Sequence, residues 1–227
     1  MTTIGLVSDI HGNLPAFEAV LEKLQTEYEV DMIICAGDIV GICGFPSEVI
    51  SLVQENCDIV VKGNHDALPF MGDVSSEVGT VEKELFFDSV PEDQQKWLYE
   101  LPSYQEVEDL NLLVAHSKPN PDESLGIKDG NAGVFPKHFT KVSSGVDFSY
   151  VVLGHSHSQH MVPDKFGHGT IVVNPGHLGD FYSDTADFAV LNTETDEVTL
   201  DSAEYNRSSV VDKVSDIEVM YGIKLIE

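Results

Sequence analysis

The chain has 227 residues, of which 42% are hydrophobic, and this length and composition predict a single domain over residues 1–227. Asp and Glu number 39 against 12 Lys and Arg, which gives a formal net charge of −27. So acidic a surface repels phosphate backbones and anionic lipids, which argues against nucleic acid and membranes as the main partners.

Five apolar runs, each followed at once by polar residues, organise the chain at residues 4–7, 32–36, 58–62, 112–115 and 150–153. Helical patterns separate the first three. Asn13 is the predicted N-cap of a helix with Phe17, Val20 and Leu21 on one face, and residues 47–54 predict another helix. Alternating strands and helices indicate a parallel sheet, in which ligands bind beyond the carboxyl ends of the strands. The five polar clusters should therefore meet in one crevice.

The second half of the chain is less regular. Residues 75–101 predict two helices, and residues 133–142 and 209–221 predict one each. After residue 158, the segments 158–166, 170–174, 187–193 and 197–205 predict antiparallel strands. The predicted fold class is α/β, an α+β sandwich of two mixed β-sheets packed together and flanked by helices.

Two histidines follow the last apolar run, in GHSH at residues 154–157. Side chains alternate along an extended chain, so His155 and His157 should face one side, with Ser156 and His160 on the other. Alone, this pattern is also typical of two exposed loop histidines. Imidazole is a common metal ligand, so the same pair could bind one ion or two neighbouring ions.

The candidate metal ligands carry oxygen or nitrogen donors and no thiolate. Six or seven such donors exceed what one tetrahedral zinc ion needs and suit two ions that share a carboxylate. Taken singly, Asp9 could cap a helix, Asp38 could hold a turn and Asn64 could occupy a left-handed turn position. The donors that follow the five runs are Asp9, His11, Asp38, Asn64, His65, Asp66, His116, His155 and His157.

The ordered motifs DIH (9–11), GD (37–38), GNHD (63–66), AH (115–116) and GHSH (154–157) resemble the calcineurin-like metallophosphoesterase superfamily, in particular its small single-domain bacterial and archaeal phosphodiesterases. The resemblance runs from residue 1 to about residue 205. It implies two divalent metal ions, with Asp38 binding both. By it, Asp9, His11 and His157 bind one ion, and Asn64, His116 and His155 bind the other.

Such a centre has a predictable chemistry. Two cations about 3.5 to 4 Å apart would present a bridging hydroxide to phosphorus, and the donor set favours Mn²⁺, with Fe, Zn, Co or Ni as alternatives. His65 would protonate the leaving oxygen, oriented by Asp66. Arg207 is the only arginine in the sequence. Because arginine forks typically bind phosphomonoesters, a small phosphodiester is the expected substrate.

Other readings of the sequence stay open. A phosphomonoesterase and a scaffold or binding protein of the same fold are the alternatives, although the retained His65 and seven ligands favour an enzyme. His177 follows NPG where the subgroup commonly has serine, and could contact substrate or only its own turn. The segment 117–131 could select substrate or form a plain surface loop. The histidines outside all motifs are expected to be structural or exposed, and they are His138, His160 and His168.

Composition also suggests the cellular setting. The N-terminus carries no secretion signal and no apolar run reaches membrane-spanning length, so we expect a cytoplasmic protein. Cys35, Cys43 and Cys57 form no CxxC pair and are expected to be reduced thiols. The dispersed acidic residues resemble those of halophilic proteins, in which molar salt shortens the Debye length to about 3 Å. The sequence leaves homo-oligomerisation open.

Overall fold

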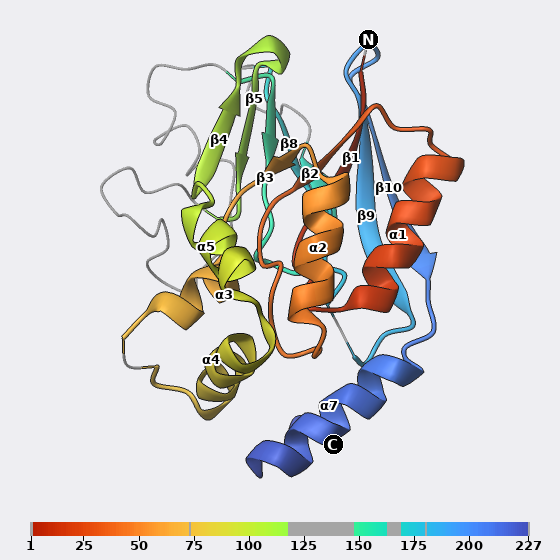
Figure 1. The fold of residues 1–227 in the computed structure, drawn as a ribbon. Helices are drawn as coiled ribbons and strands as arrows, with labels where there is room; N and C mark the ends of the chain where they lie inside the picture. The colour runs from red at the N-terminus through yellow and green to blue at the C-terminus, as the bar shows by residue number, and fades with distance from the viewer. Residues whose placement is uncertain (1, 73, 118–147, 163–168, 180, 227) are drawn as a thin grey trace.

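A computed structural model describes residues 2–72, 74–117, 148–162, 169–179 and 181–226 of the protein. Within these residues, two five-stranded mixed β-sheets lie face to face (Figure 1). The first sheet has the order β10-β9-β1-β2-β3, in which β1, β2 and β3 are parallel and β9 and β10 are antiparallel to their neighbours. Its strands are β1 (Thr3–Val7), β2 (Met32–Cys35), β3 (Ile59–Val60), β9 (Thr185–Asn192) and β10 (Glu197–Glu204).

The second sheet has the order β4-β5-β6-β8-β7. Its strands are β4 (Tyr104–Val107), β5 (Leu112–Ala115), β6 (Tyr150–Val152), β7 (His160–Val162) and β8 (Ile171–Asn174). The antiparallel strands predicted after residue 158 are confirmed in the pairs β7–β8 and β9–β10, while β8 also pairs in parallel with β6, which was not predicted. A local hairpin pattern does not say which earlier strand the hairpin joins. Strand β4 was not predicted, since its polar sequence YQEV lies at the sheet edge.

Helices cover the first sheet on the face opposite the second (Figure 1). The helices expected after Asn13, at 47–54, within 75–101 and at 209–221 are confirmed, and the one expected at 133–142 lies outside the described residues. The side chain of Asn13 caps the first helix by accepting a hydrogen bond from the backbone N–H of Ala16. The described helices are α1 (Leu14–Thr26), α2 (Pro46–Asn56), α3 (Asn64–Ala67), α4 (Glu77–Ser89), α5 (Glu92–Glu100) and α7 (Ser208–Tyr221), with the 3₁₀ helices η1 (Leu68–Phe70) and η2 (Glu108–Leu110).

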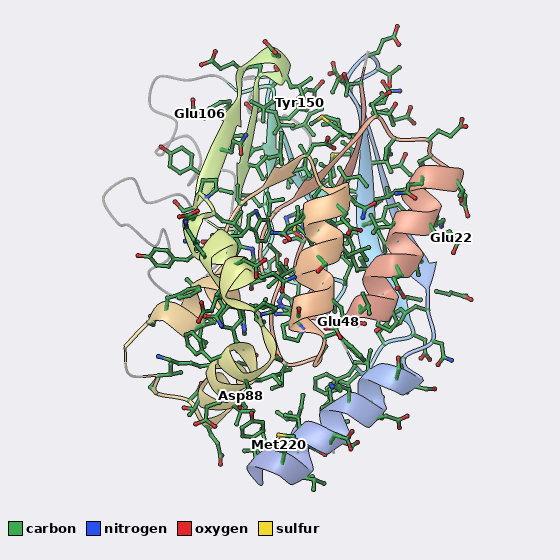
Figure 2. The ribbon with its side chains drawn as sticks, in the orientation of Figure 1. Glu22, Glu48, Asp88, Glu106, Tyr150 and Met220 are labelled. Carbon is green, nitrogen blue, oxygen red and sulfur yellow. The ribbon has the colours of Figure 1, made fainter. Side chains whose placement is uncertain are left out.

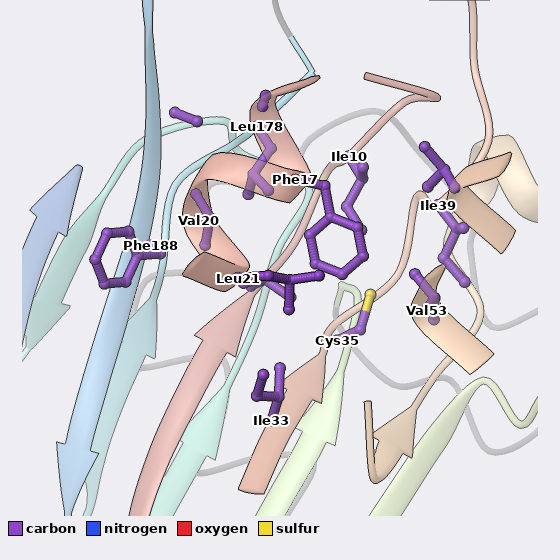
Figure 3. Packing of buried hydrophobic residues seen from close by; sticks show 14 of the residues in the cluster. Ile10, Phe17, Val20, Leu21, Ile33, Cys35, Ile39, Val53, Leu178 and Phe188 are labelled. Atoms are coloured by element: carbon purple, nitrogen blue, oxygen red, sulfur yellow. The ribbon is translucent and has the colours of Figure 1, made fainter. Parts of the chain in front are cut away.

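Alternation along the strands divides the apolar side chains between two layers. Leu6 and Ile34 face the second sheet and pack in one cluster with Val114. Ile33, one residue earlier on β2, faces the helices and packs in the layer that contains Phe17 of α1 (Figure 3). Full burial of one such side chain contributes about 1.5 to 3 kcal/mol, so a shift of register by one residue would lose both layers. This packing fixes the carboxyl ends of β1 and β2 relative to each other.

The surface carries acidic side chains on many elements. Glu22, Glu48, Asp88 and Glu106 are exposed on α1, α2, α4 and β4 (Figure 2). The acidic side chains are spread over the surface, just as they are spread along the sequence. Cys35, Cys43 and Cys57 are all free thiols. No helix among the described residues is long and apolar enough to span a membrane.

Candidate metal centre

The candidate ligands lie on loops that leave the carboxyl ends of five strands. These ends meet between the two sheets, so residues from distant parts of the chain come together, as the sequence predicted. Asp9 and His11 follow β1, Asp38 follows β2, Asn64 and His65 follow β3, His116 follows β5, and His155 and His157 follow β6.

The first group of donors contains Asp9, His11 and His157, each of which offers a ligand atom within 4.8 Å of the others. Nε2 of His157 lies 3.1 Å from Nε2 of His11 and 3.3 Å from Oδ1 of Asp9. Metal bonds of about 2.1 Å separate neighbouring ligand atoms by about 3.0 to 3.4 Å. The third distance, from Nε2 of His11 to Oδ1 of Asp9, is longer at 4.0 Å, and all three atoms lie close enough to share one metal ion.

The second group contains Asp38, His116 and His155. Nδ1 of His116 donates a hydrogen bond of 2.7 Å to the carbonyl oxygen of Ala36, which leaves Nε2 facing Asp38, 3.1 Å from its Oδ2. A backbone partner of this kind fixes the tautomer of a metal-binding histidine. The side chains of Asp38, His116 and His155 are therefore also placed to bind a cation.

Two buried polar atoms support the second site. Among the described residues, Oδ1 of Asn64 is buried without a hydrogen-bond partner, and the buried Nε2 of His116 has only ion-pair contacts, with Asp38 and Asp9. Leaving such an atom unsatisfied costs about 1 to 3 kcal/mol. A divalent cation would satisfy both, so the residues present fit the predicted metal.

Asp38 belongs to the second group and also lies near His11 of the first. Its Oδ2 is 3.1 Å from Nε2 of His116 and 3.9 Å from Nε2 of His11. Its Oδ1 accepts a hydrogen bond of 2.7 Å from the backbone N–H of His65. A carboxylate in this place has the geometry of a bridging ligand.

The carboxylates and imidazoles of the centre shift one another's pKa values. Burial acts to raise the pKa values of Asp9 and Asp38, but the nearby histidines outweigh it and hold both carboxyl pKa values below their usual range. Burial also lowers the pKa of His11 to about 4. In His116 the charge of Asp38 overcomes burial and raises the pKa to about 10. Concentrated ionised carboxylates and imidazoles of this kind are typical of functional sites.

The backbone at the site is unusual as well. Asp9, His11, Asp38, His155 and His157 all have positive φ values, between 51° and 67°. Left-handed backbone costs about 1 to 3 kcal/mol for residues other than glycine and collects at functional sites. Backbone hydrogen bonds from Asp9 N to Gly37 O and from His11 N to Asp38 O, both 2.9 Å, tie the first two loops together.

These conformations correct the argument from strand alternation. Strand β6 ends at Val152, so His155 and His157 lie in left-handed turns and not on extended chain. They therefore reach two different donor groups. Ser156 accepts a hydrogen bond of 2.9 Å from Nδ2 of Asn174, and Nδ1 of His160 donates one of 2.7 Å to the carbonyl of Ser158. The alternation rule does not apply across these turns.

Two motif glycines are required by close approach. A Cβ atom at Gly63 would lie 2.1 Å from Oδ1 of Asp38, and one at Gly154 would lie 1.9 Å from Oγ of Ser8. Neither loop has room for a side chain. The glycines of GNHD and GHSH therefore let neighbouring chain segments pass beside the carboxylates.

His65 lies beside both groups. Its ring meets the ring of His11 edge-on, with 4.6 Å between centroids. Its Nδ1 lies 2.9 Å from Oε2 of Glu82 in α4. Burial acts to lower the pKa of His65, but the hydrogen bond with Glu82 and the charge of Asp38 outweigh it and raise the pKa to about 9.

Asp66 does not orient His65, so that prediction is wrong. Its Oδ1 accepts hydrogen bonds from the backbone N–H groups of Ile39 (2.8 Å) and Val40 (3.1 Å), and its Oδ2 accepts one from Gly63 (2.8 Å). As the third residue of α3, Asp66 is within reach of the free N–H groups at the helix start. It joins the loop of Asp38 to the loop of Asn64.

Sequence reasoning missed Glu82 and left His177 undecided. Glu82 belongs to no motif, and the only signal was an acid between Val81 and Leu85 on the apolar face of a predicted helix.

The ring of His177 stacks on that of His157, with centroids 5.0 Å apart and 21° between the planes. His177 thus lies next to the first donor group. Residues 118–131, His138 and His168 lie outside the described residues.

Comparisons with known proteins identify the family of the chain. Residues 2–196 match the model of the calcineurin-like phosphoesterase superfamily domain. An uncharacterized protein of Methanocaldococcus jannaschii is 30% identical over 161 residues, which cover 68% of this chain and 62% of that protein. The chain therefore aligns with less than two thirds of this relative.

Solved structures share the fold. A metallophosphoesterase from Sphaerobacter thermophilus superimposes with a TM-score of 0.73 at 23% identity, over 98% of this chain and 95% of that one. A hypothetical protein of Pyrococcus horikoshii gives a TM-score of 0.77 at 19% identity, over 95% and 93%. An archaeal phosphodiesterase gives 0.53 at 19% identity, over 88% and 99%. With its five motifs assembled in one centre, the chain belongs to the calcineurin-like phosphoesterase superfamily.

Proposed function

We propose that this protein hydrolyses small phosphodiesters with two divalent metal ions bound between its sheets. The observation that carries the proposal is the convergence of two donor groups that Asp38 connects, since it lies in one and also groups with His11 of the other. The first ion would bind Asp9, His11 and His157, and the second Asn64, His116 and His155, with Asp38 shared. When bound, such ions activate water and stabilise negative charge on the phosphoryl oxygens.

The residues of the chain would hold the substrate and move the proton. His65 follows the ligand Asn64 directly, and its ring lies against His11. From there it would donate a proton to the leaving oxygen as the bond to phosphorus breaks. His177, stacked on His157, would line the same edge of the site.

A diester suits the charges of this centre better than a monoester. Arg207, the only arginine in the sequence, has its Nε 2.8 Å from Oδ1 of Asp184, and its Nη1 donates to the carbonyl of Phe181. It is therefore engaged outside the centre. A dianionic monoester is typically bound by arginine forks, whereas a diester carries one negative charge. The archaeal phosphodiesterase with the same fold supports this choice.

The test compares two substrates on one protein. Chelator-treated protein is supplied with Mn²⁺, the ion best matched to His, Asp and Asn donors, and given bis(p-nitrophenyl) phosphate or p-nitrophenyl phosphate at low and high salt. We expect metal-dependent hydrolysis with the diester preferred. Asp38→Asn should abolish it, while Asp109→Asn, at an exposed position in η2, should not.

Two outcomes would contradict the proposal. Faster hydrolysis of the monoester would show that the substrate class is wrong. No hydrolysis of either ester with Mn²⁺, Fe²⁺, Co²⁺, Ni²⁺ or Zn²⁺ would favour a binding or scaffold role instead.

A further inference from the structure

Glu82 is a buried acid with one ring nitrogen as its partner. The residue is 8% exposed on α4, in a chain segment that carries no site motif. Acidic side chains are almost never buried unless they are paired, because an isolated buried charge is costly. Its partner is Nδ1 of His65, 2.9 Å from Oε2 and 17 positions earlier in the chain.

The surroundings of this pair are apolar on the side of Glu82, whose side chain is 7% exposed against 30% for His65. Glu82 and His65 line one small cavity of about 10 Å³ whose wall also includes Pro69, Leu85 and Phe86. A hydrogen bond with little competing water is stronger and better oriented than one at the surface. The contact therefore restrains the ring of His65.

The contact also decides which nitrogen of His65 is available. With Nδ1 used by Glu82, Nε2 is the nitrogen left for the donor group that His65 forms with His11 and Asp38. The remaining candidate for this restraint, Asp66, is occupied by three backbone N–H groups. Among the described residues, Glu82 is thus the carboxylate within hydrogen-bond distance of the ring, while Asp38 accepts from the backbone N–H of His65.

We propose that Glu82 is the positioning residue for His65, holding Nδ1–H so that Nε2–H is presented to the leaving oxygen. This inference rests on the proposed phosphodiesterase activity. A carboxylate in the same relation to histidine fixes tautomer and orientation in the serine protease triad. Water adds to phosphorus, the bond to the leaving oxygen breaks, and that oxygen takes the Nε2 proton. After this transfer His65 is neutral and still donates its Nδ1–H to Glu82. The attacking water has released one proton to solvent, and uptake of a proton from solvent restores Nε2–H.

The kinetic test uses leaving groups that differ in their need for a proton. The substrates are alkyl aryl phosphodiesters with leaving groups from p-nitrophenol to phenol. Glu82→Leu should lower kcat about 10- to 100-fold for the phenyl ester and much less for the nitrophenyl ester, with KM and Mn²⁺ content unchanged. Glu82→Gln keeps an acceptor for Nδ1–H and should stay within a few fold of wild type.

Two further variants separate positioning from general damage. In a His65→Ala background, Glu82→Leu should cause no further loss, because both changes remove one function. Glu84→Gln, at an exposed position of the same helix, should behave as wild type. Should Glu82→Leu fail to fold, Glu82→Asp withdraws the carboxylate by one methylene and provides the same comparison.

A measurement without substrate keeps this inference separate from the proposed function. In metal-free protein with ¹⁵N-labelled histidine, the exchange-protected Nδ1 proton of His65, assigned by its loss in His65→Ala, should disappear in Glu82→Leu and persist in Glu84→Gln. If the wild-type protein cleaves no diester, the proposed activity is wrong. The spectrum would still show whether Glu82 accepts a hydrogen bond from Nδ1 of His65. Persistence of the proton in Glu82→Leu, an equal loss on all leaving groups, or additivity with His65→Ala would overturn the role of Glu82.

Discussion

Nε2 of His11 and Nε2 of His157 lie 3.1 Å apart although 146 positions separate the two residues in the chain. Two neutral imidazoles at this distance share a hydrogen bond only if one donates, and Asp9 lies 3.3 Å from the same nitrogen of His157. Three donor atoms so close together are readily explained by a common cation. His155, two residues before His157, contributes to the other group.

The first prediction is that the two histidines of GHSH serve different ions. His157→Ala should weaken the ion shared with Asp9 and His11, and His155→Ala the ion shared with His116. The affinity for the metal ion should fall at least about 10- to 100-fold in each variant. That is the typical effect of losing a residue that only supports a metal ligand, and here the ligand itself is lost. Metal analysis and anomalous scattering of each variant measure this.

Ser156→Ala is the matched control, because Ser156 contacts Asn174 and should leave both ions in place. If both histidine variants lose the same ion and keep the other, the assignment of one histidine to each ion is wrong.

The second prediction concerns the shared carboxylate. Asp38→Asn should lower the occupancy of both ions, because its loss removes a ligand from each and increases the repulsion between two dications. The effect on metal content should exceed that of either histidine variant. Asp109→Asn changes the formal charge equally and should retain two ions per chain. Full occupancy in Asp38→Asn would show that Asp38 does not bridge.

The third prediction tests close packing at a motif glycine. Gly63 has a φ of −95°, which alanine adopts freely, so Gly63→Ala acts only through its new methyl group, 2.1 Å from Oδ1 of Asp38. Overpacking of this kind costs about 1 to 3 kcal/mol, and the displaced carboxylate should lower metal content. Gly72→Ala meets no described atom within 4 Å and is the control. Equal melting temperatures and metal contents in both variants would disprove the steric requirement.

The fourth prediction gives Asp66 a structural role. Asp66→Asn places an amide N–H against one of three backbone N–H groups, which should lower the free energy of unfolding by about 1 to 3 kcal/mol. The melting temperature should fall by about 2 to 4 °C per kcal/mol. The dependence of kcat on the leaving group should not change. A steeper dependence, as expected for His65→Ala, would restore Asp66 as the residue that orients the acid.

The fifth prediction concerns the net charge of −27. Self-repulsion opposes a compact chain in dilute buffer, and screening relieves it as the Debye length falls from about 10 Å at 0.1 M salt to about 3 Å at 1 M. The melting temperature should rise between 0.1 and 2 M KCl. A flat or falling curve would reject the halophilic setting predicted from the composition.

By itself the sequence determined the parts of this protein that depend on local order. Continuous apolar runs located β1 and β2, and the 3.6 period with a capping Asn13 located α1, because such patterns reflect which side chains are buried. Polar residues directly after parallel strands predicted that Asp9, Asp38 and Asn64 would converge, since parallel strands bring their carboxyl ends to one edge.

Only the tertiary structure decided which side chains meet. Asp66, adjacent to His65, was the obvious partner for its ring, yet the backbone of neighbouring loops uses that carboxylate, and Glu82 on a separate helix reaches Nδ1 instead. The left-handed turns at His155 and His157 could not be read from GHSH, and the backbone N–H of His155 donates to Asp9, which is 146 positions away in the chain. Contacts between elements depend on how helices and sheets pack, and a single sequence carries no local signal for that.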